Sequence, residues 1–308
     1  MQRVQGRVLA SKSFHDVDEI DADNQDSYQV ATEHRQVESK ALGSEVANDP
    51  AALRHLMPEI VRGGGNLWYF GMGLAHGAKN PRNLWYDVIK QFAATPSKER
   101  DYRALCGFLH ELDTNKSTLP DELLDHALEN EPLAPYFPWL QDSVVITPRG
   151  MARLNKSVEL RKVPIHAYSG IHLGRAVEAV PAADIARYVT ALAKASDGGS
   201  VAIDVLSRLF FSDRQDKRAH APEIVEAGRE LLPQMEFDRK GLIKDYYLQE
   251  VVEVCVAGDG GYEAAKAVCD NLKRAAAEHK TYGLGHNLLL KALLKVQARG
   301  STGCIPDR

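Results

Sequence analysis

Apolar side chains recur with a helical period along most of the chain. After the dipeptide at positions 80–81, apolar residues take the i, i+3, i+4 and i+7 positions of one helix face, at Trp85, Val88, Ile89 and Phe92. The same spacing returns at 105–112, 185–192 and 248–255, and further helices run over 262–272 and through Leu289, Leu290, Leu293 and Leu294. No stretch alternates with period two for long enough to predict a strand. The pattern therefore predicts an all-α protein.

Three predicted helices share one start signal. Asp49-Pro50, Asn80-Pro81 and Thr147-Pro148 each place a side-chain oxygen before a proline. Such an oxygen accepts hydrogen bonds from the unpaired N–H groups of a first helical turn, and proline at the first position has no N–H to leave unpaired. We therefore expect helices to begin at these three prolines.

Similar turns recur along the chain. Residues 195–202 (ASDGGSVA) and 257–264 (AGDGGYEA) both end one helix and start another, and we expect glycine to supply the left-handed cap conformation there. A longer echo, about 99 residues apart, relates 69–74 (YFGMGL) to 168–173 (YSGIHL). Because helix pairs that repeat cannot bury their apolar faces alone, we expect them to stack as an α-solenoid.

Three divisions of the chain follow from this pattern. Residues 1–47 are predicted to be a polar, acidic arm or junction, largely irregular, followed by a helical-repeat domain at 48–300 and a tail at 301–308. Residues 14–50 contain ten acidic residues and only two basic ones, Arg35 and Lys40, so the net charge of this segment is −8. Most of the arm cannot bury enough apolar surface to offset the entropy lost on ordering. One hypothesis is that the acidic segment lies over a basic face until a partner displaces it; a solvated arm is the simpler alternative.

The helix-pair rhythm resembles HEAT or armadillo repeats across about residues 49–299. More faintly, 105–109 (LCGFL), 123–128 (LLDHAL) and 133–141 (LAPYFPWLQ) are similar to the helical C-terminal regions of large bacterial STAND-type NTPases. The second resemblance implies a sensor or interaction surface whose catalytic part lies elsewhere. The chain departs from that family pattern because it has no GxxxxGK[ST] phosphate loop, so nucleotide hydrolysis is not implied.

Composition narrows the class of protein. The 308 residues are 44% hydrophobic and 26% charged, as in ordinary globular proteins, and the net charge of −4 is unlike that of a dedicated nucleic-acid binder. The four cysteines are dispersed without a CxxC pair, which is atypical of disulfide frameworks and zinc modules. The sequence has no signal-peptide-like start and no apolar run of membrane-spanning length. We therefore expect a cytoplasmic protein that does not associate with a membrane.

No recognisable catalytic or metal motif stands out. The glycine-rich loop at 62–66 lacks the preceding strand and following Lys-Ser/Thr of a phosphate loop, and the histidines show no HExxH spacing. Ser169 is not in a GxSxG motif, and Glu122 with Asp125 sits where acids favour a helix start. We therefore predict no catalytic residues, metal ligands or cofactors, and lean away from an enzyme.

The most suggestive surface is a basic run. Between residues 147 and 175 the only acidic residue is Glu159. The basic residues and histidines of this segment are Arg149, Arg153, Lys156, Arg161, Lys162, His166, His172 and Arg175. The first three lie at i, i+4 and i+7, so we expect them on one helix face, where like charges repel unless a partner neutralises them. A second basic group occupies 273–299. A solvated helix face is the alternative to an anion-binding surface.

Two functions follow from these patterns. The leading hypothesis is a non-enzymatic interaction or sensor module that binds a protein through a groove or the basic face. The alternative is a nucleic-acid-binding HEAT-like protein, similar to the helical-repeat DNA glycosylases, that uses the same basic residues. Aromatic clusters at 68–70 and 136–139 are expected to pack internally, or to anchor a protein partner if exposed.

Overall fold

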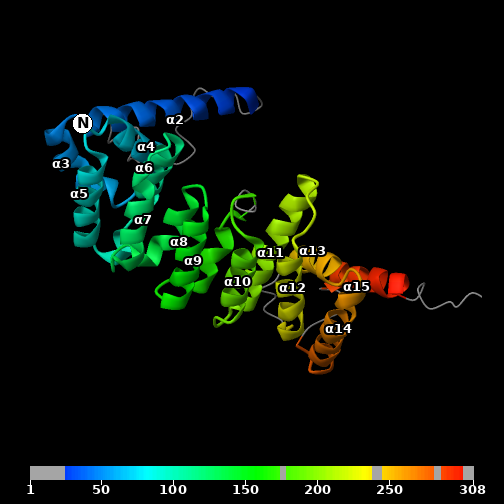
Figure 1. Ribbon diagram of the computed structural model, residues 1–308. Helices are drawn as coiled ribbons and strands as arrows, with labels where there is room; N and C mark the ends of the chain where they lie inside the picture. Colours follow the sequence, from blue (N-terminus) through cyan, green and yellow to red (C-terminus); the bar gives the residue numbers. More distant parts are fainter. Residues whose placement is uncertain (1–24, 174–177, 238–244, 281–285, 301–308) are drawn as a thin grey trace, which may run out of the picture. The chain divides into compact units, whose positions relative to one another are not determined.

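Helices make up every regular element in the part of the chain that a computed structural model describes. The described residues are 25–173, 178–237, 245–280 and 286–300, with side chains except at 25–28, 259 and 296–300. Within these ranges all regular elements are α- or 3-10 helices, so the all-α prediction is confirmed there (Figure 1). The residues belong to two compact units, 1–145 and 146–308, and the range 48–300 includes parts of both.

The three proline start signals form helices as predicted. Asp49 accepts hydrogen bonds from the backbone N–H groups of Ala51 and Ala52, at 2.9 and 3.0 Å. Asn80 caps the next start through the N–H of Asn83, and Thr147 caps the third through that of Gly150. Local side-chain chemistry therefore sets these three helix boundaries.

The predicted apolar stripes are buried in most helices. The four apolar residues of 85–92, 105–112, 185–192 and 248–255 are all at most 7% exposed. The last helix differs, because Leu289 and Leu293 are buried whereas Leu290 and Leu294 are 36% and 64% exposed. Four neighbouring leucines therefore divide between two faces of that helix.

The first unit is built around a layer of alternate helices. Its elements are α2 (Gln25–Ala47), α3 (Pro50–Ile60), α4 (Leu67–Gly77), α5 (Pro81–Ala94), η3 (Ser97–Glu99), α6 (Arg103–Thr114), α7 (Leu119–Glu129), η4 (Ala134–Tyr136) and α8 (Phe137–Asp142). Helix α4 packs against both α2 and α6, and α3 packs against α5 (Figure 1). The chain therefore places helices two apart in sequence side by side.

Glycines let these helices approach closely. A Cβ atom added at Gly73 in α4 would lie 2.0 Å from the carbonyl oxygen of Lys40 in α2. On the other side of α4, a Cβ at Gly71 would lie 2.0 Å from the carbonyl oxygen of Ala104, and one at Gly107 would lie 1.9 Å from that of Trp68. No larger residue fits at these positions without moving backbone atoms.

Helix α2 corrects the predicted irregular arm at residues 25–47, the part of 1–47 that the structure describes. Residues 25–47 are helical, and Ser39, Leu42, Gly43 and Val46 are buried against the unit. The Lys40 ammonium also donates to the buried Glu111 carboxylate at 2.7 Å. The composition is polar because only this narrow stripe is buried. Residues 1–24 and the predicted tail at 301–308 lie outside the described residues.

The second unit also pairs alternate helices. Its elements are α9 (Pro148–Leu160), η5 (Ile165–Gly170), α10 (Ala182–Ala193), α11 (Gly198–Gln215), α12 (Pro222–Leu231), η7 (Leu232–Gln234), α13 (Asp245–Cys255), η8 (Asp259–Gly261), α14 (Tyr262–Ala277) and α15 (Asn287–Gly300). Helix α11 packs against α13 and α13 against α15, while α10 packs against α12. Ion pairs also join α11, α13 and α15. Arg214 of α11 contacts Glu250 of α13, and Glu253 of α13 contacts Lys295 of α15.

The two glycine-pair turns differ in detail. At the second turn Gly258, which precedes the glycine pair, has φ +77° and ψ −178°, a conformation open mainly to glycine but different from the predicted left-handed cap. At the first turn Asp197, not a glycine, takes the left-handed conformation, with φ +58°, and Gly198 begins α11. The first glycine is needed for space instead, because an added Cβ would lie 1.9 Å from the Leu192 carbonyl oxygen.

The longer sequence echo does not correspond to matching structure. Residues 69–74 lie within helix α4, whereas 168–170 end the 3-10 helix η5 and 171–173 follow it. Gly71 meets the α6 backbone, but Gly170 faces open space. The similarity of the two segments is therefore confined to sequence.

Candidate functional site

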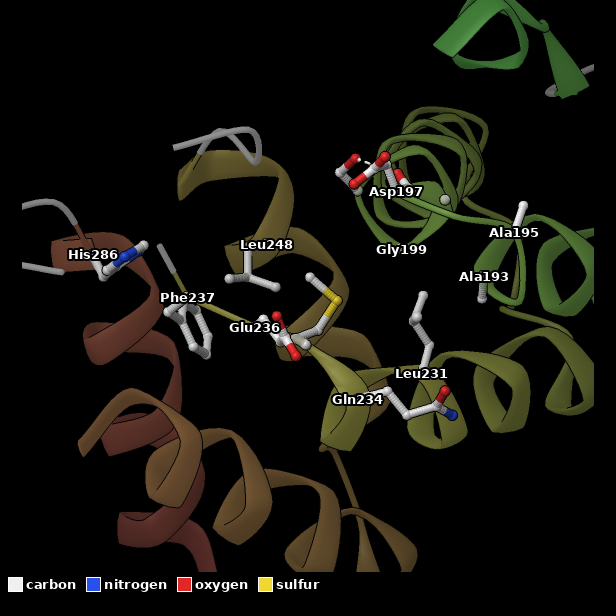
Figure 2. A pocket seen from close by; sticks show the side chains of 13 residues that line it. Ala193, Ala195, Asp197, Gly199, Leu231, Gln234, Glu236, Phe237, Leu248 and His286 are labelled. Atoms are coloured by element: carbon white, nitrogen blue, oxygen red, sulfur yellow. Dashed lines mark hydrogen bonds between the residues drawn. The ribbon is translucent and has the colours of Figure 1, made fainter. Parts of the chain in front are cut away.

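A recess in the second unit is the clearest candidate site. It has a volume of about 310 Å³ and opens where the end of α10, the first turn of α11, η7 and the neighbouring ends of α13 and α15 meet (Figure 2). It is lined by Ala193, Ala195, Asp197, Gly198, Gly199, Ser200, Leu231, Gln234, Met235, Glu236, Phe237, Leu248 and His286. This volume is at the small end of the range for ligand pockets in proteins.

The recess joins an apolar wall to a polar mouth. Leu231, Met235, Phe237 and Leu248 are each at most 6% exposed, so their side chains form the wall. The side chains that remain exposed are polar, and they are Asp197, Gln234 and Glu236. An occupant would therefore meet apolar surface inside and polar groups where it enters.

The open space depends on the turn between α10 and α11. Asp197 reverses the chain in the left-handed conformation, which aspartate tolerates better than most residues. Gly198 then packs on the end of α10, while Gly199 faces the recess. A Cβ added at Gly199 would meet only the Met235 sulfur, at 3.9 Å, so this glycine leaves room for an occupant.

The charge of the recess is negative. Among the residues that the structure describes, two lining residues are carboxylates, Asp197 and Glu236, and none is lysine or arginine. The Asp197 carboxylate accepts a hydrogen bond from the Ser196 hydroxyl, at 3.4 Å. Lys280 interacts electrostatically with Glu236, but its ammonium lies 2.6 Å from the Glu278 carboxylate. The described part of the mouth therefore combines two acidic groups with no lining lysine or arginine.

His286 borders the other side of the recess. Its side chain is 14% exposed and packs edge-on against the Phe237 ring, with 5.1 Å between ring centroids. Burial lowers the pKa of His286, opposed by the charge of Asp245, whose carboxylate lies 3.9 Å from the ring nitrogen. The ring is therefore protonated less readily than a free histidine.

The structure divides the predicted basic face on α9. Arg149 and Lys156 are exposed, but Arg153 is only 5% exposed, although the helical spacing placed all three together. The expected exposed face of three cations is therefore reduced to two. Arg153 lies on the buried side of α9 together with Met151 and Leu154.

The other predicted binding residues lie beyond this helix. Arg161 ends α9 with φ +53° and is exposed, as is Lys162. His166 and His172 are exposed near η5, and Arg175 lies outside the described residues. None of the seven predicted residues that the structure describes lines the recess.

The remaining sequence candidates have structural roles. Residues 62–66 connect α3 and α4, where Arg103 donates to the Gly64 carbonyl oxygen and pairs with Asp101. The rings of Tyr102 and Trp139 stack with centroids 5.0 Å apart, beside Tyr136. The aromatic segment at 136–139 therefore packs within the first unit, with three of these rings half-buried.

In the ranges that the structure covers, no three histidine, cysteine, aspartate or glutamate side chains are placed to hold a metal ion. Within the same ranges, no helix combines the length and apolar character needed to cross a membrane.

The recess was not predicted from the sequence. The only feature of the sequence that points to this region is the glycine pair at 198–199, which predicts a turn but not a recess. Its lining comes from segments up to 93 residues apart in the chain, between Ala193 and His286, and only the packing of the helices brings them together. Comparisons with protein-family models, curated proteins and solved structures found no match for this chain.

Proposed function

We propose that this protein is a helical-repeat interaction module that binds a segment of a partner protein in the recess of its second unit. The side-by-side packing of α10 with α12, and of α11 with α13 and α15, supports a solenoid-like stack. Stacks of this kind present grooves between the ends of successive helices, and the recess lies at such a position (Figure 2).

The observation that carries the proposal is the open, apolar recess itself. Its wall is formed by side chains that are buried yet border space of about 310 Å³. Burying an apolar side chain there would remove further surface from water, at roughly 25 cal/mol per Å². The volume suits one or two side chains of a bound segment.

In this proposal the partner binds in the recess and not on the basic face of α9. Burial of Arg153 leaves α9 with two exposed cations, a small charge for phosphate binding. The nucleic-acid alternative is tested by titrating labelled duplex DNA at 50 and 200 mM salt. Binding at 50 mM that weakens steeply at 200 mM would favour that alternative over the groove.

A variant that fills the recess tests the proposal. Gly199→Leu projects a side chain into the space, and the nearest atom is the flexible Met235 sulfur, so the fold should be retained. Gly170→Leu is the matched control, since an added Cβ at Gly170 meets nothing within 4 Å. Circular dichroism and thermal melts of both variants establish that they fold.

The assay is selection of a phage-displayed random peptide library on the intact chain. We expect enriched peptides to bind the wild type and Gly170→Leu, and to lose most of their affinity for Gly199→Leu. Peptides that bind all three proteins equally, or no enrichment on the wild type, would show that the recess is not a peptide-binding site.

A further inference from the structure

The occupant of the recess must satisfy two acidic groups at its mouth. Asp197 comes from the turn before α11, and Glu236 follows η7, so separate elements supply the two carboxylates (Figure 2). A segment that enters the recess covers these groups and removes water from them. Covering a carboxylate without a cationic or hydrogen-bonding partner costs free energy.

The wall imposes a second requirement. Leu231, Met235 and Leu248 offer apolar contact behind the mouth, which suits a chain of methylene groups. Lysine and arginine combine such a stem with a cationic head, and commonly bury the stem while the head stays near water and acids. An aspartate or glutamate would meet the same wall but would be repelled at the mouth.

From these two features we infer that the recess accepts a lysine or arginine side chain of the partner segment, with its stem along the apolar wall and its cation beside Asp197 and Glu236. This inference rests on the proposed function and adds the chemical class of the anchoring residue. The described residues of the lining include no lysine or arginine that would compete with the incoming cation. Burial lowers the pKa of His286, so this ring takes up a proton less readily than a free histidine and repels a cation less.

Methionine-methyl NMR of the intact chain tests the inference directly. The protein has five methionines, and Met235 is the one that lines the recess. With carbon-13-labelled methionine methyl groups, N-acetyl-arginine N-methylamide should shift the Met235 signal in a saturable manner. N-acetyl-glutamate N-methylamide should produce no saturable shift, and N-acetyl-norleucine N-methylamide should bind more weakly than the arginine probe.

Charge-removing variants identify the groups responsible. Glu236→Gln and Asp197→Asn keep the side-chain size, and asparagine tolerates the left-handed backbone that residue 197 requires. Each should weaken binding of the arginine probe roughly two- to fivefold, the effect expected for one partly exposed ion pair. Glu159→Gln, at an exposed position on α9 outside the recess, is the control and should leave the affinity unchanged.

The outcomes separate this inference from the proposed function. Equal binding of the arginine and norleucine probes, or unchanged affinity in both charge variants, would overturn the cation preference. Peptides selected on the wild type should carry lysine or arginine at the position most sensitive to Gly199→Leu. Selected peptides that need the open recess but lack a basic residue there would leave the proposed function standing and refute the inference.

Discussion

Replacing Gly73 by alanine tests whether α2 and α4 cross as closely as the structure shows. The new methyl carbon would lie 2.0 Å from the Lys40 carbonyl oxygen and 2.9 Å from the Gly43 Cα atom. Both are backbone atoms, so no side-chain rotation can relieve the overlap. To reach the ordinary contact distance of 3.4 Å, the carbonyl would have to move about 1.4 Å away.

A shift of this size affects the whole crossing between the two helices. Opening a packed contact by 0.5–1 Å already loses about a quarter to a half of its dispersion energy. Inserting a methylene into a well-packed core costs about 1–3 kcal/mol. Because the obstruction at Gly73 is backbone, we expect a loss in the upper part of this range, about 2–3 kcal/mol in the free energy of unfolding.

The three tryptophans make this loss measurable for the first unit alone. Trp68, Trp85 and Trp139 all lie within residues 1–145, so urea unfolding followed by tryptophan fluorescence reports that unit. The control is Gly199→Ala, another helical glycine, whose added Cβ meets only one atom at 3.9 Å; it is followed by circular dichroism. It should be neutral or stabilise by up to about 1 kcal/mol.

The double variant Gly43→Ala/Gly73→Ala adds a test of the same crossing. Both methyl groups push the same pair of backbones apart, so the combined loss should be smaller than the sum of the single losses. A loss below about 0.5 kcal/mol for Gly73→Ala, which is the scatter of ordinary surface substitutions, would refute the close glycine-mediated crossing.

Three further predictions concern other buried groups. Gly198→Ala should destabilise the second unit by about 1–3 kcal/mol, because its Cβ would meet the Leu192 carbonyl oxygen. Gly199→Ala, at the next position, should not destabilise it. Equal denaturation midpoints of the two variants, measured by circular dichroism, would contradict this prediction. Burial raises the pKa of the Cys106 and Cys255 thiols to about 12, so neither should react with a disulfide reagent at pH 8 until urea unfolds the chain; rapid labelling of either cysteine in the native protein, located by mass spectrometry, would contradict their burial. Burial by itself would raise the pKa of Glu111, but the hydrogen bond and charge of Lys40, with hydrogen bonds from Asn115 and His76, lower this pKa overall. The ionised Glu111 therefore stabilises the fold above its unfolded pKa near 4.3, and this contribution is lost as pH falls through the lower pKa of the folded state. Lys40→Met should therefore reduce the acid sensitivity of the tryptophan-monitored midpoint between pH 6 and pH 3, and an unchanged pH profile would exclude this pair as its source.

Sequence reasoning succeeded where a local signal sets the structure. The helical period placed the buried faces of α5, α6, α10 and α13, since one apolar stripe on a helix has only one way to leave water. Oxygen-bearing caps at Asp49, Asn80 and Thr147 set three helix starts, because the capping residue and its N–H partners are at most three positions apart.

It failed where a distant neighbour decides the outcome. Helix α2 is too polar to indicate burial by composition, yet Gly43 and Gly73 let it pack on α4. Arg153 was expected on an exposed face and is buried, while Leu290 and Leu294 were expected inside and are exposed. In each case the side chain's exposure depends on which helix packs beside it, and one helix's sequence does not contain that information.

The candidate site shows the same division. Local patterns in the sequence predict the helices, several of their first residues and the turn at the glycine pair 198–199. The packing of the helices places Gly198 against a backbone carbonyl and Gly199 beside open space, and it brings Asp197, Glu236 and Leu248 to the same recess. The two kinds of feature differ in range, because hydrogen bonds within a helical turn join neighbours in sequence, whereas a recess is enclosed by van der Waals surfaces from segments far apart in the chain.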